Sequence, residues 1–407
     1  MNNLLSVEEA WAKITTLARP LPVELRLLDK AQGYVLAEQI SAASDLPPFD
    51  NSAMDGYALR SADTAGSSID NPVRLSIVGE VAAGAFRDEP VHPGTAVKIM
   101  TGAAIPPGAD TVLMLEDGRA RGNHVEVRQP ISPGKHVRVR GEDVRKDEVL
   151  FNAGVRLNSQ MLGLLASNGI AQIRVHRSPS IGVLATGSEL ICAGTPLKSG
   201  QIHDSNRLVL RSLLKRAETR VVDLGIVADD PIAISERVRE GLRLDVLIIS
   251  GGVSVGEHDH VKEVLRQLNV ETVFWRVNMK PGKPIFCGRL GERWIFGLPG
   301  NPISCVVGFL VFVEPLIRRL QGELSSKPRY RLSRLGRSIQ KTDARAAFMT
   351  ALAEPCSDGM LRVSPTEQQG SAMMKALALA NAFIVVPANR AEINEGELVD
   401  ALLIDDI

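Results

Sequence analysis

Apolar segments alternate with amphipathic helical patterns between residues 177 and 322, and this alternation constrains the fold more than any other feature of the chain. Residues 181–185 and 246–249 are almost continuously apolar, which is typical of strands that are buried on both faces. Apolar residues at helical spacing follow in the segments that begin at Asp204 and at Asp229. Strands and helices in this order predict an α/β domain whose parallel sheet is covered by helices on both faces.

Two helical patterns flank a long insertion in the first half of the chain. Ser6 and the glutamate three residues later form a capping box at the start of the first pattern, and the second begins near Ser159 and ends before Gly169. Each pattern has one apolar face, so we expect the two helices to pack together in a linking domain. This domain is expected to comprise residues 1–48 and 144–176.

The two remaining regions have the alternating pattern of β-strands. Between residues 49 and 143, several short segments alternate apolar and polar residues, which predicts an inserted β-rich lobe. Residues 323–407 contain further strand patterns, two of them separated by a hairpin signal at Asp358-Gly359. We therefore expect a small C-terminal β-barrel or sandwich, and a multidomain α/β protein as a whole.

The charge balance and the apolar content exclude several classes of protein. Lysine plus arginine and aspartate plus glutamate number 47 each, so no overall field favours nucleic acid or an anionic membrane. The longest apolar stretch, residues 303–313, is too short to span a bilayer, and the N-terminus lacks the pattern of a signal peptide. The four cysteines have neither zinc-site nor disulfide spacing. We expect a cytoplasmic protein with no nucleic-acid or membrane partner, in which any anion site is local.

Glycine-rich loops follow three of the predicted strands, at the edge where open parallel sheets bind ligands. Backbone N–H groups in such loops converge on anions, and the helix that follows adds a partial positive charge. One such loop fits a tight turn equally well, but three at one edge predict a phosphate-binding site. The candidate ligand-binding residues are Thr186, Gly187, Ser250, Gly251, Gly252, Ser254, Gly256, Pro299, Gly300 and Asn301.

Carboxylates occupy the same predicted edge. Glu189, Asp229, Asp230 and Asp259 supply the hard oxygen ligands that suit Mg²⁺. An aspartate at a helix start is often only an N-cap, and this interpretation is strongest for Asp230, which directly precedes Pro231. Which of Asp229 and Asp230 faces the ligand stays open. The candidate Mg²⁺ ligands are Glu189, Asp229 and Asp259.

Further charged or polar residues lie in rigid turns. Arg276, Lys280 and Lys283 belong to a proline-stiffened turn, which forms either a solvated surface or a cationic cradle for an oxyanion. The segment around Asp55 and the strand end at Thr101 fit structural corners as well as functional sites. The sequence has no Walker A motif. These residue types favour phosphate chemistry assisted by a metal ion.

Seven segments closely resemble the molybdopterin molybdenumtransferase family, to which the C-terminal domain of gephyrin is related. They are Pro-Pro-Phe-Asp-Asn-Ser-Ala-Met-Asp-Gly-Tyr-Ala at 47–58, Ile-Met-Thr-Gly at 99–102, Arg-Gly-Glu-Asp at 140–143, Thr-Gly-Ser-Glu-Leu at 186–190, Ser-Gly-Gly-Val-Ser-Val-Gly at 250–256, Lys-Pro-Gly-Lys-Pro at 280–284 and Gly-Leu-Pro-Gly-Asn-Pro at 297–302. The resemblance covers essentially the whole chain and implies a small β-barrel as the C-terminal domain. It also implies the reaction, in which molybdenum from molybdate is inserted into adenylylated molybdopterin and AMP is released with Mg²⁺.

The resemblance further implies roles for individual residues. The implied catalytic residues are Asp55, Thr101, Asp143, Glu189, Asp229, Asp259 and Lys280. Arg276, Lys283 and Ser371 are implied to bind substrate together with the residues of the glycine loops. Members of the family are homodimers, so the inserted lobe is expected to complete the site of a partner subunit. Relatives commonly have an arginine where this chain has Thr350, and frequently a lysine at the position of Arg276.

Two other functions share parts of this pattern. Molybdopterin adenylyltransferase, which catalyses the preceding step and is an expected partner, has the same α/β fold but needs neither the Asp55 lobe nor the C-terminal domain. A non-catalytic scaffold, which is the role of gephyrin at receptor clusters, does not require Glu189, Asp229 and Asp259. This sequence has all of these features, which favours the molybdenumtransferase.

Overall fold

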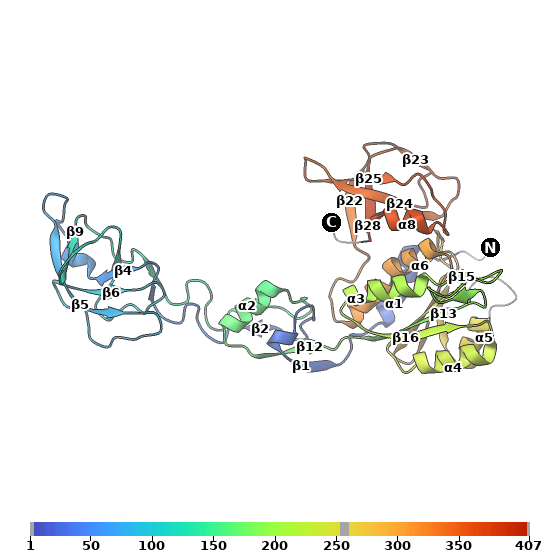
Figure 1. Cartoon of the computed structure of the whole chain (residues 1–407), viewed down its shortest axis with the longest axis horizontal. Helices are drawn as coiled ribbons and strands as arrows, with labels where there is room; N and C mark the ends of the chain where they lie inside the picture. The colour runs from blue at the N-terminus through green and yellow to red at the C-terminus, as the bar shows by residue number, and fades with distance from the viewer. Residues whose placement is uncertain (1–3, 253–259, 405–407) are drawn as a thin grey trace.

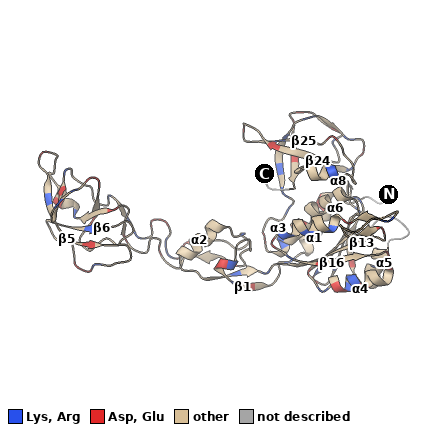
Figure 2. Cartoon of the chain, viewed as in Figure 1, with Lys and Arg blue, Asp and Glu red and all other residues tan. Residues whose placement is uncertain are grey.

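The computed structural model describes residues 4–252 and 260–404, which form an elongated molecule (Figure 1). The inserted lobe lies at one end, the linking domain follows it, and the α/β domain with the C-terminal barrel beside it forms the other end. Acidic and basic positions are spread over all of these domains (Figure 2), in keeping with their equal numbers in the sequence. Over the described ranges, no helix is long and apolar enough to cross a membrane.

A six-stranded sheet forms the centre of the α/β domain. Its strands lie in the order β16 (Arg220–Val227), β13 (Ser180–Thr186), β17 (Val246–Ser250), β21 (Arg293–Leu298), β20 (Phe286–Leu290) and β18 (Glu271–Trp275). The first four strands are parallel, which confirms the predicted sheet, whereas β20 and β18 extend it antiparallel. Every residue of β13 and β17 is buried, because helices cover both faces.

Helices cover the two faces around separate apolar clusters. One face carries α3 (Asn206–Arg216), α6 (Pro302–Gly308) and α7 (Glu314–Leu320), and the other carries α4 (Pro231–Gly241) and α5 (His260–Gln267). Between α6 and α7, the segment Phe309–Val313 forms a π-helical turn. Pro315 accounts for this irregularity, since it has no N–H to donate to the carbonyl of Val311. Two short strands, β14 (Leu190–Ile191) and β15 (Ile202–His203), pair in parallel beside the sheet.

The first helix, α1 (Val7–Leu17), packs in the α/β domain. Its predicted capping box forms at Ser6. Trp11 and Ile14 are buried in the cluster that also contains α6 and α7, so the expected packing of α1 on the helix near Ser159 is wrong. The apolar face of a helix shows that the helix is buried, but it does not specify the surface that covers it.

The linking domain buries a small core of its own around α2 (Ser159–Ser167) and η1 (Leu28–Lys30). Its strands form two antiparallel pairs, β1 (Val23–Leu27) with β12 (Gln172–His176) and β2 (Ile40–Ser41) with β11 (Val149–Phe151). The helix α2 ends where the sequence predicts, because Gly169 adopts a φ of 77° and its N–H donates to the Ala166 carbonyl at 2.9 Å.

The inserted lobe is a β domain, as predicted. Its six-stranded sheet has the order β7 (Thr111–Met114), β4 (Gly56–Leu59), β6 (Thr95–Ile99), β5 (Val73–Val81), β9 (His124–Val127) and β8 (Arg119–Arg121). A second pair, β3 (Asn51–Ser52) and β10 (Val137–Arg138), and the short helix η2 (Ser61–Thr64) complete the lobe. Apolar clusters lie on both faces of the larger sheet.

The C-terminal domain is a closed barrel, as the resemblance implies. Its strands follow one another in the order β24 (Ala346–Pro355), β25 (Leu361–Pro365), β22 (Tyr330–Leu335), β28 (Leu398–Leu403) and β26 (Ala382–Val386), which pairs with β24 again. The hairpin between β24 and β25 forms at the predicted turn, where Gly359 has a φ of 81°. The remaining elements are α8 (Met374–Leu379) and the pair β23 (Ile339–Gln340) and β27 (Glu392–Ile393). The strand β19 (Met279–Lys280) pairs with β24 and so joins the α/β domain to the barrel.

Candidate active site

A pocket of about 610 Å³ lies at the carboxyl ends of β13, β17 and β21. We call it the glycine-loop pocket, because it is where the three glycine-rich loops meet. Of the residues expected at this edge, it is lined by Thr186, Gly187, Glu189, Asp229, Ser250, Gly251, Gly252, Pro299, Gly300 and Asn301. Ser254, Gly256 and Asp259 lie outside the described residues. The parallel sheet therefore brings three segments that are far apart in the sequence to one cavity.

Two glycines in this pocket are required by the close approach of the loops. Gly251 has a φ of 92°, and a Cβ atom added to it would lie 2.4 Å from the carbonyl oxygen of Thr186. Gly252 has a φ of 63°, and its Cβ atom would lie 2.6 Å from the Thr186 hydroxyl oxygen. That hydroxyl is buried and has no hydrogen-bond partner in the described part of the chain. The two glycines thus let the loop backbone pack directly against Thr186, whose unpaired hydroxyl is covered by them.

The two neighbouring aspartates have different positions. Asp230 is the N-cap of α4, and its Oδ1 accepts a hydrogen bond from the Ala233 N–H at 2.8 Å. Asp229 lines the glycine-loop pocket, where its Oδ2 accepts from the Ser188 N–H at 3.1 Å. The Asp229 N–H donates in turn to the Ser188 hydroxyl at 3.0 Å, so the two residues hold each other. Of the pair, only Asp229 lines the pocket.

Glu189 and Asp229 supply the carboxylates with which Mg²⁺ would be held. Both are exposed, and the Glu189 carboxylate lies over Gly187, with Oε2 2.6 Å from where a Cβ atom of that glycine would be. Among residues 4–252 and 260–404, no three or more His, Cys, Asp or Glu side chains form a metal-binding group. Two carboxylates still fit Mg²⁺, which usually takes one or two from the protein and its other ligands from phosphate and water.

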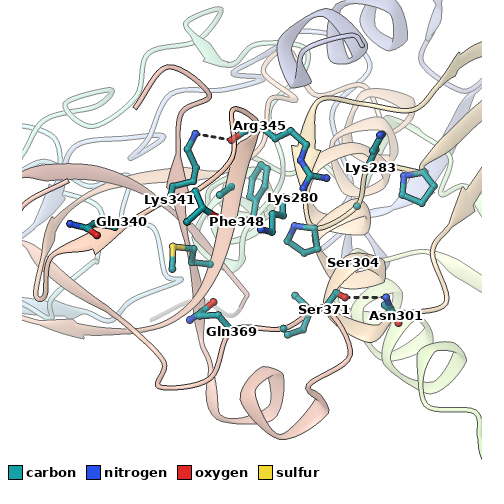
Figure 3. Close-up of a pocket in the computed structure, with 18 residues that line it drawn as sticks. Lys280, Lys283, Asn301, Ser304, Gln340, Lys341, Arg345, Phe348, Gln369 and Ser371 are labelled. Carbon is teal, nitrogen blue, oxygen red and sulfur yellow. Dashed lines mark hydrogen bonds between the residues drawn. The ribbon is translucent and has the colours of Figure 1, made fainter. Parts of the chain in front are cut away.

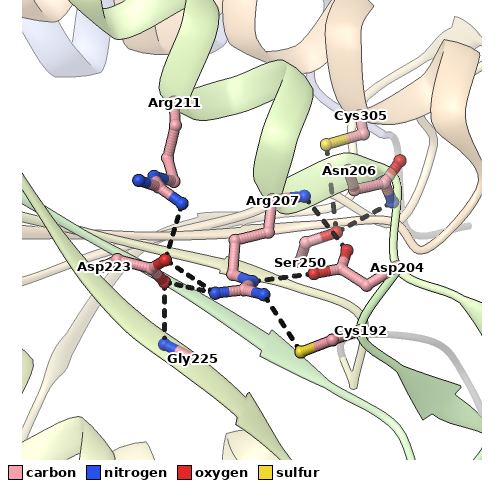
Figure 4. A network of polar contacts seen from close by, with 9 residues as sticks. All are labelled: Cys192, Asp204, Asn206, Arg207, Arg211, Asp223, Gly225, Ser250 and Cys305. Atoms are coloured by element: carbon pink, nitrogen blue, oxygen red, sulfur yellow. Dashed lines mark hydrogen bonds and ion pairs between the residues drawn. The ribbon is translucent and has the colours of Figure 1, made fainter. Parts of the chain in front are cut away.

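A buried asparagine holds two of the loops together, and the sequence analysis did not identify it. The Nδ2 atom of Asn206 donates to Ser250 Oγ at 2.9 Å (Figure 4), and it also donates to the Gly300 carbonyl at 2.7 Å. The same network contains Arg207, which contacts Asp204 at 2.8 Å and Asp223 at 2.6 Å. Burial opposes the charge of Arg207, but the hydrogen bonds to the two aspartates raise the pKa of its guanidinium. The start of α3 therefore forms a fixed polar wall of the pocket.

A second pocket, of about 410 Å³, lies between the α/β domain and the barrel (Figure 3). We call it the cationic pocket, because four of its lining residues are basic: Lys280, Lys283, Lys341 and Arg345. Ser304, Gln369 and Ser371 also line it. Pro284 and Asn301 line both pockets, so the two cavities adjoin.

The basic residues of this pocket differ in what they contact. Lys280 and Arg345 bind the carboxylate of Asp343 at 2.9 and 3.1 Å, and the hydrogen bonds from Arg345 and then from Lys280 hold the pKa of Asp343 well below its usual value. The Lys341 ammonium donates to three backbone carbonyls, at 2.7 to 3.1 Å. Lys283 has no side-chain partner in the described ranges. Its ammonium group is therefore available to a ligand.

The barrel contributes Ser371, while two other expected positions lie elsewhere. Ser371 Oγ accepts a hydrogen bond from Asn301 Nδ2 at 3.0 Å, so it lies where the two pockets adjoin. Thr350 is buried, and its hydroxyl is paired with that of Thr366 at 2.7 Å; it lines neither pocket. The Arg276 guanidinium stacks on the Trp275 ring, 4.0 Å from its centroid, and it lines neither pocket either.

The inserted lobe holds a fixed carboxylate of its own. Asp55 Oδ1 accepts hydrogen bonds from both the N–H and the hydroxyl of Thr101, each at 2.7 Å. Both bonds lower the pKa of Asp55, and the bond from the Thr101 N–H has the larger effect. Asp143 lies exposed in the same lobe. Within one chain this lobe is at the opposite end of the molecule from the α/β domain (Figure 1), so these residues do not meet Glu189 and Asp229.

Comparison with known proteins gives matches along nearly the whole chain. The family descriptions "MoeA N-terminal region (domain I and II)", "Probable molybdopterin binding domain" and "MoeA C-terminal region (domain IV)" match residues 5–169, 182–319 and 333–404. A molybdopterin molybdenumtransferase from Haemophilus influenzae is 36% identical over 97% of this chain and 98% of its own. One from Staphylococcus aureus is 32% identical over 98% and 96%.

A solved structure agrees with the sequence matches. The molybdopterin biosynthesis MoeA protein from Pyrococcus horikoshii has a TM-score of 0.84 at 29% identity, and the match covers 100% of both chains. The likeness therefore includes the inserted lobe and the barrel as well as the α/β domain. With its complete set of MoeA domains, this chain belongs to the family of molybdopterin molybdenumtransferases.

Proposed function

We propose that this chain inserts molybdenum from molybdate into adenylylated molybdopterin, with Mg²⁺-dependent release of AMP. The observation that carries the proposal is the pair of adjoining pockets, which share Pro284 and Asn301. The glycine-loop pocket suits the phosphates of the pterin substrate. The cationic pocket suits a tetrahedral dianion such as molybdate. Because the pockets adjoin, the dianion and the pterin can be bound close to one another.

Some residues of the two pockets would bind the substrates, and others would stabilise the charge that develops on them. Lys283 is free to contact an oxyanion, and Lys280 is held in place by Asp343. Glu189 and Asp229 would hold Mg²⁺, which when bound offsets negative charge on the cleaved phosphates. The exposed backbone of the glycine loops would orient the phosphates for cleavage.

We further propose that the working form is a homodimer, in which the inserted lobe of each subunit completes the site of the other. The separation of Asp55 from the glycine-loop pocket within one chain supports this proposal. The linking domain also presents an apolar surface, since Val23, Leu25 and Leu27 on β1 are 48, 63 and 46% exposed. We place the enzyme in the cytoplasm and expect molybdopterin adenylyltransferase to supply its substrate.

The proposed reaction is tested by AMP release from adenylylated molybdopterin in the presence of molybdate and Mg²⁺. Asp229→Asn removes a carboxylate from the pocket and should lower the rate about 100-fold. Asp230→Asn is the matched control: asparagine caps a helix as well as aspartate does, so the rate should stay within about twofold. A wild-type protein that only consumed ATP to adenylylate molybdopterin would instead have the function of the adenylyltransferase.

The shared site is tested by mixing two inactive variants. In a mixed dimer of Asp229→Asn and Asp55→Asn subunits, one of the two sites combines an intact α/β domain with an intact lobe. If subunits exchange freely, the mixture should regain about a quarter of the wild-type rate, while each variant alone stays inactive. A mixture that stays as inactive as its components, although mixed dimers are present, would refute the sharing of residues between subunits.

A further inference from the structure

A third cavity, of about 570 Å³, lies away from both pockets described above, where three domains meet. Gly33 and Arg156 come from the linking domain, the segments around Arg216 and Arg318 from the α/β domain, and the rest from the barrel. Figure 1 shows α3 and β28, which contribute to its wall, on the side of the molecule that faces the linking domain. Its volume is within the range of about 300–1,000 Å³ that small-molecule sites occupy.

Five arginines line this cavity, which we call the arginine pocket, against two glutamates. The arginines are Arg156, Arg216, Arg318, Arg329 and Arg331, and the glutamates are Glu218 and Glu314. Such an excess stands out in a chain whose acidic and basic residues balance. It makes the cavity a local anion site.

Some of these arginines are fixed by the protein, and others are not. Arg156 is held by Glu323 at 2.6 Å and by Gln321 at 2.6 Å. Neither Arg329 nor Arg331, which are exposed on the barrel side, has a side-chain partner in the described ranges. The pocket thus has a rigid cationic wall and two guanidinium groups that are available to a ligand.

Arg318 is buried in the wall of the pocket with part of its guanidinium unpaired in the described residues. Its side chain is only 6% exposed, and its buried Nε atom has no hydrogen-bond partner among the described residues. Its closest carboxylate, that of Glu323, is 3.6 Å from Nη1, and a backbone carbonyl, that of Lys327, accepts from Nη2. Burial lowers the pKa of this guanidinium; Glu314 and Glu323 oppose that effect, while Arg329 and Arg156 add to it. A buried cation in this situation is stabilised by a bound anion.

One part of the wall is apolar. It consists of Leu213, Phe309, Leu310, Leu402 and Leu403. Phe309 and Leu310 belong to the π-helical turn, a conformation that is rare in proteins and frequent at functional sites. A bare inorganic anion would leave this wall without contacts, whereas an organic anion would cover it.

We propose that the arginine pocket binds an organic phosphate monoester, whose phosphate contacts Arg318, Arg329 and Arg331 and whose apolar group packs on Phe309 and Leu310. Guanidinium groups form paired hydrogen bonds with carboxylates and phosphates alike, but a phosphate monoester offers three terminal oxygens to the three arginines, where a carboxylate offers two. Since the lining comes from three domains, a bound ligand fixes the linking domain, the α/β domain and the barrel relative to one another. This site is independent of the two pockets in the proposed reaction.

Isothermal titration of the full chain with phenyl phosphate, inorganic phosphate and phenol tests this assignment. Phenyl phosphate should bind, and each of the other two should bind at least about tenfold more weakly, because each offers only half of the contacts. Equal affinities for phenyl phosphate and inorganic phosphate would overturn the role of the apolar wall. Equal affinities for phenyl phosphate and phenol would overturn the role of the arginines.

Variants locate the binding site. The double variant Arg329→Gln, Arg331→Gln changes two exposed residues, so folding is expected to persist, and it should weaken phenyl phosphate binding about tenfold or more. Lys283→Gln changes the cationic pocket in the same way and should leave this affinity within about twofold. The reverse pattern, with binding lost in Lys283→Gln and kept in the double variant, would place the phosphate in the cationic pocket and overturn the proposal.

Discussion

Replacing Gly251 by alanine tests whether the glycine loops are shaped by close contact between strands. The added Cβ atom would lie 2.4 Å from the Thr186 carbonyl oxygen, at least an ångström closer than an ordinary contact of about 3.4 Å. Both atoms belong to backbone at the ends of neighbouring parallel strands, because Ala185 pairs with Ser250. No side-chain rotation can relieve the contact, so one strand end has to move.

The expected cost has two parts. A left-handed backbone, here with a φ of 92°, costs a residue other than glycine about 1–2 kcal/mol. Overpacking in a close-packed region costs about 1–3 kcal/mol more. Gly251→Ala should therefore lower the free energy of unfolding of the α/β domain by about 2–5 kcal/mol, which lowers its melting temperature by roughly 10 °C.

Gly300→Ala is the matched control in the same pocket. Its Cβ atom would lie 3.9 Å from the nearest heavy atom, the Cα of Gly251, and its φ is not positive. We expect its melting temperature to stay within about 3 °C of the wild type, since a compatible glycine-to-alanine change alters stability by only about 0.4–1 kcal/mol. Differential scanning calorimetry of the three proteins measures both effects. Equal melting temperatures for the two variants would refute the argument from close contact.

Three further substitutions test the contacts of single residues, one through ligand affinity, one through stability and one through a pKa. Lys283→Gln should raise the Kd for molybdate about tenfold without lowering the melting temperature, because the ammonium has no partner within the described ranges; unchanged affinity would contradict its role. Lys341→Met leaves three carbonyls without a donor and should lower the free energy of unfolding by about 1–3 kcal/mol in urea titrations; an unchanged free energy would show that these contacts do not stabilise the barrel. Thr101→Val removes one of the two donors to Asp55, so NMR titration should find the carboxyl pKa partly returned toward its ordinary value of about 3.9. Because the pKa of Asp55 is lowered on folding, the stability that this pair contributes is present above that ordinary value and is lost as the pH falls through the lowered one.

Features with a local cause could be predicted from the sequence. The N-cap at Asp230 depends on a side chain and an N–H three residues apart, and the end of α2 depends on one glycine. The parallel sheet followed from segments that are apolar on both faces. In each case the residues that determine the structure are neighbours in the chain.

Features with a distant cause could not be predicted. Asn206 looks like an ordinary residue at the start of a helix, but its partners, Ser250 and Gly300, are 44 and 94 positions away. The apolar face of α1 is equally visible in the sequence, yet nothing in it selects the α6–α7 surface over α2. At Thr350 the resemblance leads us to expect an arginine, and only the structure shows the threonine hydroxyl paired inside the barrel.

The geometry of Asp55 bears on the proposed dimer. An exposed carboxylate contributes little to the stability of a lobe, and usually keeps no fixed orientation. Asp55 is nevertheless held by two hydrogen bonds from Thr101, in a lobe that lies at the opposite end of the chain from the α/β domain. In the glycine-loop pocket, Glu189 and Asp229 are likewise exposed at the mouth of a cavity. Exposed acidic groups on two different domains support the proposal that a second subunit brings them together around one substrate.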